Sequence, residues 1–448
     1  MNEEVKVPSS DKIVPKDDKE NTLIGTEVFT VNEVKAEIPD GGLQAWTVLF
    51  GCFCGIFAIY SINYSWGVFL NHYNAVVFPG ELNQLSWIGS ICIALYFWIG
   101  PVNEWVTRKL GYTRMLPIAT IICPLAMMLA SISHQIWHLY LTQGVLFGLG
   151  ASLVWFPCIG APQQWFSKKR GLAVGITISG CGIGGLIVSN VCQLAIEHLD
   201  YRWALRISGF ICFFFMVIAT FLIKECPAYA AQAPQQCGTA AANRSIVQTQ
   251  LSLLRNPQFI TLLIIGFVTT FGYLVSLTHT VSYANFIGLD AWVGTNLSAI
   301  MSAVNAVSML AIGGISDKLG RINCLFVCTL LSGIFSLSVW TTAHNEAAIW
   351  IYVVLYGFFG AGYIILFGAV LPEVAGYENI SAANGLLYFT NLFGYLFGTP
   401  ITSAIITHSD PPNYTGGIVW SGLLMSVGGL FCLLLRIVRG GWNPCIKI

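Results

Sequence analysis

Three glycines in the first half of the chain have a spacing that could bind a nucleotide. Gly180, Gly182 and Gly185 lie in the segment KKRGLAVGITISGCGIGGLI and match the pattern GxGxxG. In dinucleotide-binding proteins such glycines form a turn between a strand and a helix, and the helix N-terminus holds the pyrophosphate. An acid about 20 residues further on binds the ribose, and Glu197 and Asp200 occupy that region. The surrounding elements decide whether such a cofactor site can exist.

The composition of the chain places these glycines in lipid rather than in a soluble domain. Of the 448 residues, 55% are hydrophobic and only 9% are charged, and the mean hydropathy is +0.70. Soluble globular proteins carry about 25% charged residues. We therefore expect a membrane protein whose partners are the lipid bilayer and a small-molecule substrate. We expect no nucleic acid and no required protein partner.

Twelve apolar stretches are long enough to cross a bilayer, for which a helix needs about 20 apolar residues. The first six are Ala45–Leu70, Leu85–Val106, Met115–Ile132, Trp137–Gly160, Leu172–Leu194 and Ala204–Ile223. The second six are Phe259–Ala284, Val293–Ile315, Asn323–Thr342, Ile349–Leu371, Ala382–Ile406 and Gly417–Leu435. The sequence therefore predicts an all-α membrane protein with 12 transmembrane helices.

A polar segment with Pro227, Pro234 and Pro257 separates the two sets of six and is typical of a linker. We therefore predict six-helix bundles at 39–223 and 259–437, joined by a cytoplasmic linker at 224–258. Residues 1–38 are hydrophilic and lack the apolar stretch of a signal peptide, so we predict a disordered tail there. A second tail covers 438–448.

The positions of the basic residues predict the orientation of the chain. If the N-terminus is cytoplasmic, all of the 21 Lys and Arg residues except Arg202 and Arg206 fall on the cytoplasmic side. Cytoplasmic loops of membrane proteins carry such an excess. We therefore expect both termini in the cytoplasm. We expect the plasma membrane as the location, with a vacuolar or other organelle membrane as the alternative.

Within a membrane helix the glycines have a different use. Gly171, Gly175 and Ser179 recur every four residues, and so do Gly180 and Gly184. Stripes of small residues let two membrane helices approach closely. A nucleotide turn requires a strand and a water-exposed backbone instead. We therefore predict that Gly175, Ser179, Gly180 and Gly184 serve helix packing, and we expect no cofactor.

A short loop recurs at the same place in each half. The loop after the second stretch is GPVNEWVTRKLGYTR, and the loop after the eighth is GGISDKLGR. Each has a glycine, an acid, basic groups and, near its end, a Gly that precedes a final Arg. The first copy is longer and has Glu in place of Asp. An ordinary positive-inside loop explains the charges but not the repeated acid. The candidate gating residues are Glu104, Arg108, Arg114, Asp317, Lys318 and Arg321.

This pair of loops resembles the signature loop of the major facilitator superfamily. The acid can lie against a helix N-terminus or the basic groups of a neighbouring helix, and the glycines permit a tight turn. The resemblance implies two pseudo-symmetric bundles that rock around a site at the membrane midplane. It further implies that the first, fourth, seventh and tenth helices line the substrate cavity.

A narrower resemblance, from Pro39 to about Arg439, is to the monocarboxylate-porter family. It rests on PDGGLQAW before the first helix, QQWFSKKRGLAVGITISGCGIGG at the fifth, VSYANFIG in the seventh and PEVAGYENISAANGL between the tenth and eleventh. The family-signature residues are Asp40, Gly41, Trp46, Lys169 and Arg170. The hydrophilic acidic tail and the segment YRWALR favour the fungal branch.

The chain departs from this family where its proton-coupled carriers hold three charges. By register, Tyr64, Asn305 and Met309 occupy the positions of the family's Lys, Asp and Arg. No carboxylate lies at mid-depth in any predicted helix, although intramembrane ionisable groups usually mark coupling sites. We therefore predict uncoupled movement, or coupling through His279, because histidine titrates near neutral pH. The alternative for His279 is a hydrogen-bonded packing role.

Uncharged polar and aromatic side chains on the expected lining helices suit a planar or weakly charged solute. For each of them, packing or a place in an interfacial aromatic belt is the alternative. The predicted cavity residues are Asn63, Tyr64, Trp66, Trp155, Phe156, His279, Tyr283, Asn305, Tyr363 and Asn391.

The sequence therefore predicts a secondary transporter that moves a small organic solute, monocarboxylate-like or planar and neutral, by alternating access. Because family members without the charged triad include riboflavin carriers, a riboflavin-type facilitator is an alternative. A non-transporting receptor on the same fold is another alternative, although the segment after Leu435 is short. An enzyme is not expected, since His and Asp do not cluster within the spans. The 14 cysteines and the pair His134 and His138 form no metal-binding frame.

Overall fold

A computed structural model describes residues 41–441 except 167, 228–245, 377–378 and 409–412. The predicted tail at 1–38, Asp40 and most of the predicted tail at 438–448 lie outside the described residues. The side chains of Glu104 and Arg108 also lie outside them. The described segments contain helices and turns but no strand.

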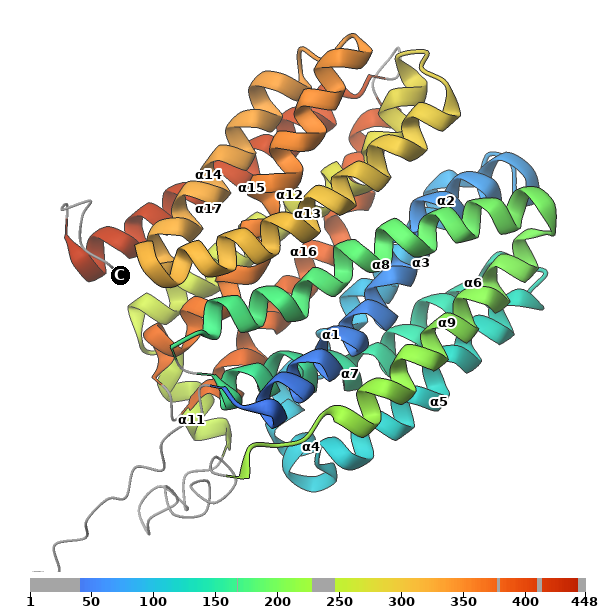
Figure 1. Cartoon of the computed structure of the whole chain (residues 1–448). Coiled ribbons are helices and arrows are strands. Elements are labelled where there is room, and N and C mark those ends of the chain that lie inside the picture. The colour runs from blue at the N-terminus through green and yellow to red at the C-terminus, as the bar shows by residue number, and fades with distance from the viewer. Residues whose placement is uncertain (1–40, 167, 228–245, 377–378, 409–412, 442–448) are drawn as a thin grey trace, which may run out of the picture. The chain divides into compact units, whose positions relative to one another are not determined.

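The helices of the first half follow the predicted apolar stretches (Figure 1). The first is α1 (Leu43–Tyr64), which continues through α2 (Trp66–His72) and η1 (Tyr73–Val77). The others are α3 (Leu82–Leu95) with η2 (Gly100–Val102), α4 (Asn103–Leu110), α5 (Tyr112–Ser131), α6 (Ile136–Leu139) with η3 (Tyr140–Leu146) and α7 (Phe147–Trp165), α8 (Arg170–His198) and α9 (Tyr201–Leu222).

The second half begins with the short helix α11 (Ile246–Leu253), which lies within the predicted linker. Its Gln250 side chain donates to the carbonyl of Pro101 at 2.7 Å, so this part of the linker is attached to the first half. The other helices are α12 (Pro257–Phe286), α13 (Ala291–Leu319), α14 (Arg321–Phe335) with η4 (Ser336–Trp340), α15 (Glu346–Ala375), α16 (Ile380–His408) and α17 (Thr415–Gly440).

Eleven helices among the described residues are long and apolar enough to span a membrane. The remaining predicted stretch, Ala382–Ile406, forms the 29-residue helix α16, which is not among these eleven. Its polar side chains Asn384, Asn391, Thr399 and Thr402 are buried, and α16 packs against α12 and α3. The predicted all-helical membrane fold is confirmed, and one face of α16 is buried against helices of both halves.

The two halves meet along two helix pairs, α8 with α13 and α3 with α16. Glycines make the first contact close, since a Cβ added to Gly175 would lie 2.5 Å from the carbonyl oxygen of Met309. The opposite face of α8 packs against α1 of its own half, where a Cβ on Gly180 would lie 2.7 Å from the carbonyl oxygen of Phe53. The GxGxxG glycines thus lie inside a membrane helix between two neighbours.

Glycines also end the helices at the two similar loops. Gly111 and Gly320 have φ values of 65° and 99°, a conformation that residues with a Cβ rarely adopt. Each lies between two helices, α4 and α5 in the first half and α13 and α14 in the second. We call the end of the protein where these loops lie the signature end, and the opposite end the cavity end.

Candidate functional site

A cavity opens at the cavity end, between the two halves. With its mouth it holds about 1330 Å³ of space free of atoms. Its walls come from α1, α2, α3 and α8 of the first half and from α12, α13 and α16 of the second, with Tyr414 at the rim. A ligand in this cavity would therefore touch both halves at once.

The cavity wall is uncharged. Among the described residues, none of those that line it is Asp, Glu, Lys or Arg. Its polar groups are hydroxyls, the amides of Asn63, Asn71 and Gln193 and the imidazole of His279, and its apolar groups include Leu274. Such a wall offers hydrogen bonds and apolar contact but no counter-ion for a charged solute.

Four of the predicted cavity residues line this cavity: Asn63, Tyr64, Trp66 and His279. Six do not, because their side chains are buried in helix contacts: Trp155, Phe156, Tyr283, Asn305, Tyr363 and Asn391. The expectation that the fourth and tenth helices contribute also differs from this structure, in which α7 and α15 contribute no lining residue. The second, fifth, eighth and eleventh predicted helices, which are α3, α8, α13 and α16, line the cavity together with the first and the seventh.

His279 joins two helices of the second half at the cavity wall. Its Nε2 lies 3.1 Å from the hydroxyl of Ser403 on α16, and its Nδ1 lies 2.9 Å from the hydroxyl of Thr278. The side chain is only 8% exposed. Both ring nitrogens therefore have partners, and the histidine is held in place as well as facing the cavity.

A stripe on α16 that the sequence analysis missed also lines the cavity. Thr399, Ser403 and Thr407 recur every four residues and therefore share one face of the helix. An i, i+4, i+8 pattern of hydroxyl residues in a spanning segment is a readable signal for a cavity wall. The prediction named only Asn391 on this helix and left its hydroxyl residues out.

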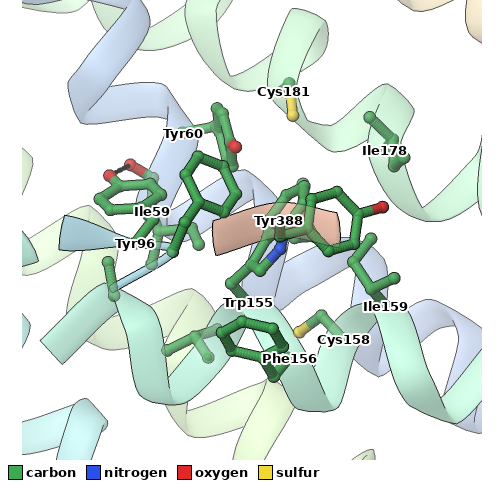
Figure 2. Close-up of a cluster of buried hydrophobic side chains, with 14 of the residues drawn as sticks. Ile59, Tyr60, Tyr96, Trp155, Phe156, Cys158, Ile159, Ile178, Cys181 and Tyr388 are labelled. Carbon is green, nitrogen blue, oxygen red and sulfur yellow. Dashed lines mark hydrogen bonds between the residues drawn. The ribbon is translucent and has the colours of Figure 1, made fainter. Parts of the chain in front are cut away.

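Below the cavity, five buried aromatic residues fill the space between the halves; we call Tyr60, Phe97, Trp155, Tyr388 and Tyr395 the aromatic plug. Figure 2 shows Tyr388 of α16 beside Trp155 of α7, and their ring centroids are 5.4 Å apart. The Phe97 ring stacks on both Tyr388 and Tyr395, at 5.8 and 5.3 Å. Side chains of the second half thus insert into the core of the first and close the path from the cavity.

The signature end is closed by a direct approach of backbones. A Cβ on Gly100, where the second span ends, would clash with the carbonyl oxygen of Gly385 on α16, and the reverse clash also occurs. Next to this contact the Asn384 amide donates to the side chain of Gln163 at 3.1 Å. The structure therefore combines an open cavity at one end with a sealed contact at the other.

A second contact across the halves involves Asp317 of the signature loop. Its carboxylate accepts from the backbone N–H groups of Gly171 and Leu172 at 3.2 and 3.1 Å, at the N-terminus of α8. Arg321 binds the same carboxylate at 2.8 Å and Glu373 at 3.0 Å. A helix N-terminus carries a partial positive charge, so Asp317 joins α8 to the second half.

The other predicted gating and family-signature residues lie around these contacts. Arg114, Lys318 and Lys169 are exposed, whereas Arg170 at the start of α8 is fully buried. Trp46, 42% exposed, packs edge-on against Phe166 with 5.5 Å between ring centroids. Gly41 has a φ of 153°, just before α1 begins.

We predict that Asp317→Asn lowers the transport rate about tenfold. A hydrogen bond to a charged group contributes about 1.5–3 kcal/mol to stability, and here it stabilises the contact between α8 and the second half. The variant keeps the shape of the side chain but loses its charge toward Arg321 and the α8 N-terminus. Transport by purified protein in liposomes measures the effect. Lys318→Gln, which removes an exposed neighbouring charge, is the control and retains the wild-type rate. Equal rates for the two variants would contradict the role given to Asp317.

Comparisons with known proteins agree with this architecture. The family model of the Major Facilitator Superfamily matches residues 48–399 and 297–443. The solved structure of the proton:xylose symporter XylE is similar with a TM-score of 0.66 and 12% identity, covering 89% of this chain and 96% of that one. At this identity the similarity concerns the fold.

Two curated fungal relatives cover nearly the whole chain. The MFS transporter asaE of Aspergillus flavus is 28% identical over 91% of this chain and 90% of that protein. The agnestins efflux protein AgnL12 of Paecilomyces divaricatus is 28% identical over 88% of each. These comparisons leave the narrower monocarboxylate-porter resemblance a prediction. The chain belongs to the Major Facilitator Superfamily and is a multi-pass membrane protein that acts as a secondary transporter, not an enzyme.

Proposed function

We propose that this transporter exports a planar, uncharged organic solute down its concentration gradient by alternating access. The observation that carries the proposal is the cavity wall, which is uncharged throughout its described residues and offers hydroxyl, amide and aromatic groups. An ion without a partner is costly to bury, so such a wall favours a neutral solute over a charged one. Relatives named as efflux proteins support the outward direction.

A monocarboxylate is the second candidate substrate and would keep the narrower family resemblance. Its carboxylate needs a cation or several directed donors, and the described wall offers no Lys or Arg. A non-transporting receptor is the third possibility. The open cavity at one end and the close glycine contact at the other are the features expected of a carrier in one of its two states, which favours transport.

We further propose that the signature end faces the cytoplasm and that the protein lies in the plasma membrane. The charge distribution of the loops supports this orientation, since the described loops at the signature end carry most of the described Lys and Arg residues. The structure then represents an outward-facing state. For an exporter, this is the state that releases its solute.

A competition panel in cells that express the chain tests the substrate class. The panel contains riboflavin as a planar neutral solute, with lactate, acetate, a dicarboxylate and an amino acid as alternatives. We expect riboflavin to move and the small carboxylates to have no effect on its rate. Strong competition by lactate together with lactate transport would instead assign the chain to the carboxylate carriers.

The pH dependence of transport separates uncoupled movement from coupling through His279. Because the described cavity wall holds no carboxylate, we expect a flat rate between about pH 5 and pH 8 in liposomes, the range in which an ordinary histidine titrates. His279→Gln keeps hydrogen-bonding capacity without a titratable ring and should show the same flat profile. A steep dependence on an inward proton gradient that disappears in His279→Gln would establish coupling through this residue.

A further inference from the structure

Three buried hydroxyl groups at the cavity or next to it complete no hydrogen bond of normal geometry among the described residues; we call Tyr64, Tyr273 and Thr399 the floor hydroxyls. Tyr64 and Thr399 line the cavity. Tyr273 is 2% exposed, and its hydroxyl faces that of Tyr64 from the other half without completing a hydrogen bond of normal geometry. Tyr64 comes from α1, Tyr273 from α12 and Thr399 from α16.

Two neighbouring tyrosine hydroxyls of the same core are paired, whereas those of Thr177, Thr269 and Thr329 also have no partner among the described residues. Tyr352 donates to the hydroxyl of Ser276 at 2.7 Å, and Tyr356 donates to the carbonyl of Tyr273 at 2.9 Å. Buried polar groups are normally paired, and an exception calls for a partner that completes it. Of the unpaired hydroxyls, those of Tyr64 and Thr399 belong to side chains that line the cavity, where a bound ligand can become their partner.

We infer that the floor hydroxyls are the polar anchor of the substrate site and bind a neutral carbonyl oxygen. Hydroxyl groups donate, and a carbonyl oxygen accepts through two lone pairs. A carboxylate would also accept, but the described cavity wall offers no cation to balance its charge. This inference rests on the proposed function and adds to it the group by which the solute is recognised.

The remainder of the solute lies above the anchor, against apolar side chains. The apolar side chains that line the cavity include Trp66, Leu70, Leu274, Leu277 and Ile406. An aromatic ring system placed there contacts these groups while its carbonyl reaches the floor. Because the anchor takes groups from both halves, a bound solute connects α1 with α12 and α16. The substrate class is therefore a planar, neutral ring system with a carbonyl at one end.

Binding of three matched probes to the purified full-length protein tests this assignment. The probes are 7-methoxycoumarin, 2-methoxynaphthalene, which lacks the ring carbonyl, and 7-methoxycoumarin-3-carboxylate, which adds a charge. We expect the wild type to bind the coumarin about tenfold more tightly than the naphthalene, as one to two hydrogen bonds provide. The carboxylate should bind more weakly than the neutral coumarin.

Tyr64→Phe, Tyr273→Phe and Thr399→Val remove the hydroxyls and keep the shape of each side chain. Each should reduce the coumarin preference at least threefold while leaving naphthalene binding unchanged, as one hydrogen bond provides. Tyr352→Phe is the matched control and should retain the full preference. Equal binding of coumarin and naphthalene by the wild type, no binding of either, or an unchanged preference in all three variants overturns the assignment.

Transport measured on the same preparations separates this inference from the proposed function. Riboflavin transport by a wild type that shows no carbonyl preference would overturn the anchor and leave export of planar solutes standing. A carbonyl preference in a protein that moves lactate but not riboflavin would overturn the proposed function and leave the floor hydroxyls as a ligand site.

Discussion

Gly385→Leu is expected to abolish transport and to leave the signature end open. The Cβ of any larger residue at this position would collide with the carbonyl oxygen of Gly100 in the other half, and backbone atoms cannot rotate away. Overpacking of this kind raises the free energy of the state in which the signature end is closed by about 3 kcal/mol. Because each 1.4 kcal/mol is a factor of ten, the closed state should lose about a hundredfold in population.

Labelling of a cysteine introduced at Asn384 with a polar maleimide measures this opening, in a parent protein in which Cys237 and Cys445 are replaced by Ser. The twelve described cysteines are buried, so the background should then be low. We expect slow labelling in the parent protein and fast labelling when Gly385→Leu is added. Gly314→Leu is the control, because a Cβ at Gly314 meets no atom within 4 Å. Wild-type transport and slow labelling in the Gly385 variant would show that this contact does not close the carrier.

Gly180→Leu should act differently, by preventing the first half from folding. Gly180 packs on α1 of its own half, and an added Cβ would lie 2.7 Å from the carbonyl oxygen of Phe53 and 3.0 Å from the backbone nitrogen of Phe57. We expect this contact to persist in both transport states, so its loss should destabilise each of them. The expected cost of about 3 kcal/mol or more is a large part of the stability of a typical domain.

Size-exclusion profiles and thermal melting of the purified protein check this expectation. We predict a severalfold loss of monodisperse Gly180→Leu protein and a lower melting temperature, with Gly314→Leu close to the wild type. By contrast, Gly385→Leu should remain folded and fail only in transport. If Gly180→Leu folds and melts like the wild type, the α1–α8 contact is not the tight packing surface that these distances describe.

The membrane fold could be predicted from the sequence because hydropathy reports directly on the bilayer. The helix α16 shows the limit of that signal, since its buried Asn384, Asn391 and Thr399 lower the hydropathy of a helix that is long enough to span a bilayer. The junction between the halves could not be predicted. Gly175 belongs to a visible stripe of small residues, but the stripe does not say that α13 is its partner.

The cavity was predicted only in part, because hydropathy does not fix the rotation of a helix that is apolar on all sides. Trp155 and Tyr363 lie on the helices expected to line the cavity, yet they pack in the core. Tyr64 was identified as a cavity residue through the family register. Which residues of the second half lie near Tyr64 depends on the relative rotation of α1, α12 and α16, which no local pattern encodes.

Counterflow in liposomes tests the central claim, the carrier-mediated movement of a planar neutral solute, most directly. Vesicles with purified protein are loaded with unlabelled riboflavin and diluted into labelled riboflavin, without a proton gradient. We predict transient accumulation of label by the wild type, none by Gly385→Leu, and none when lactate replaces riboflavin on both sides. Lactate accumulation that requires a proton gradient, with riboflavin excluded, would contradict it.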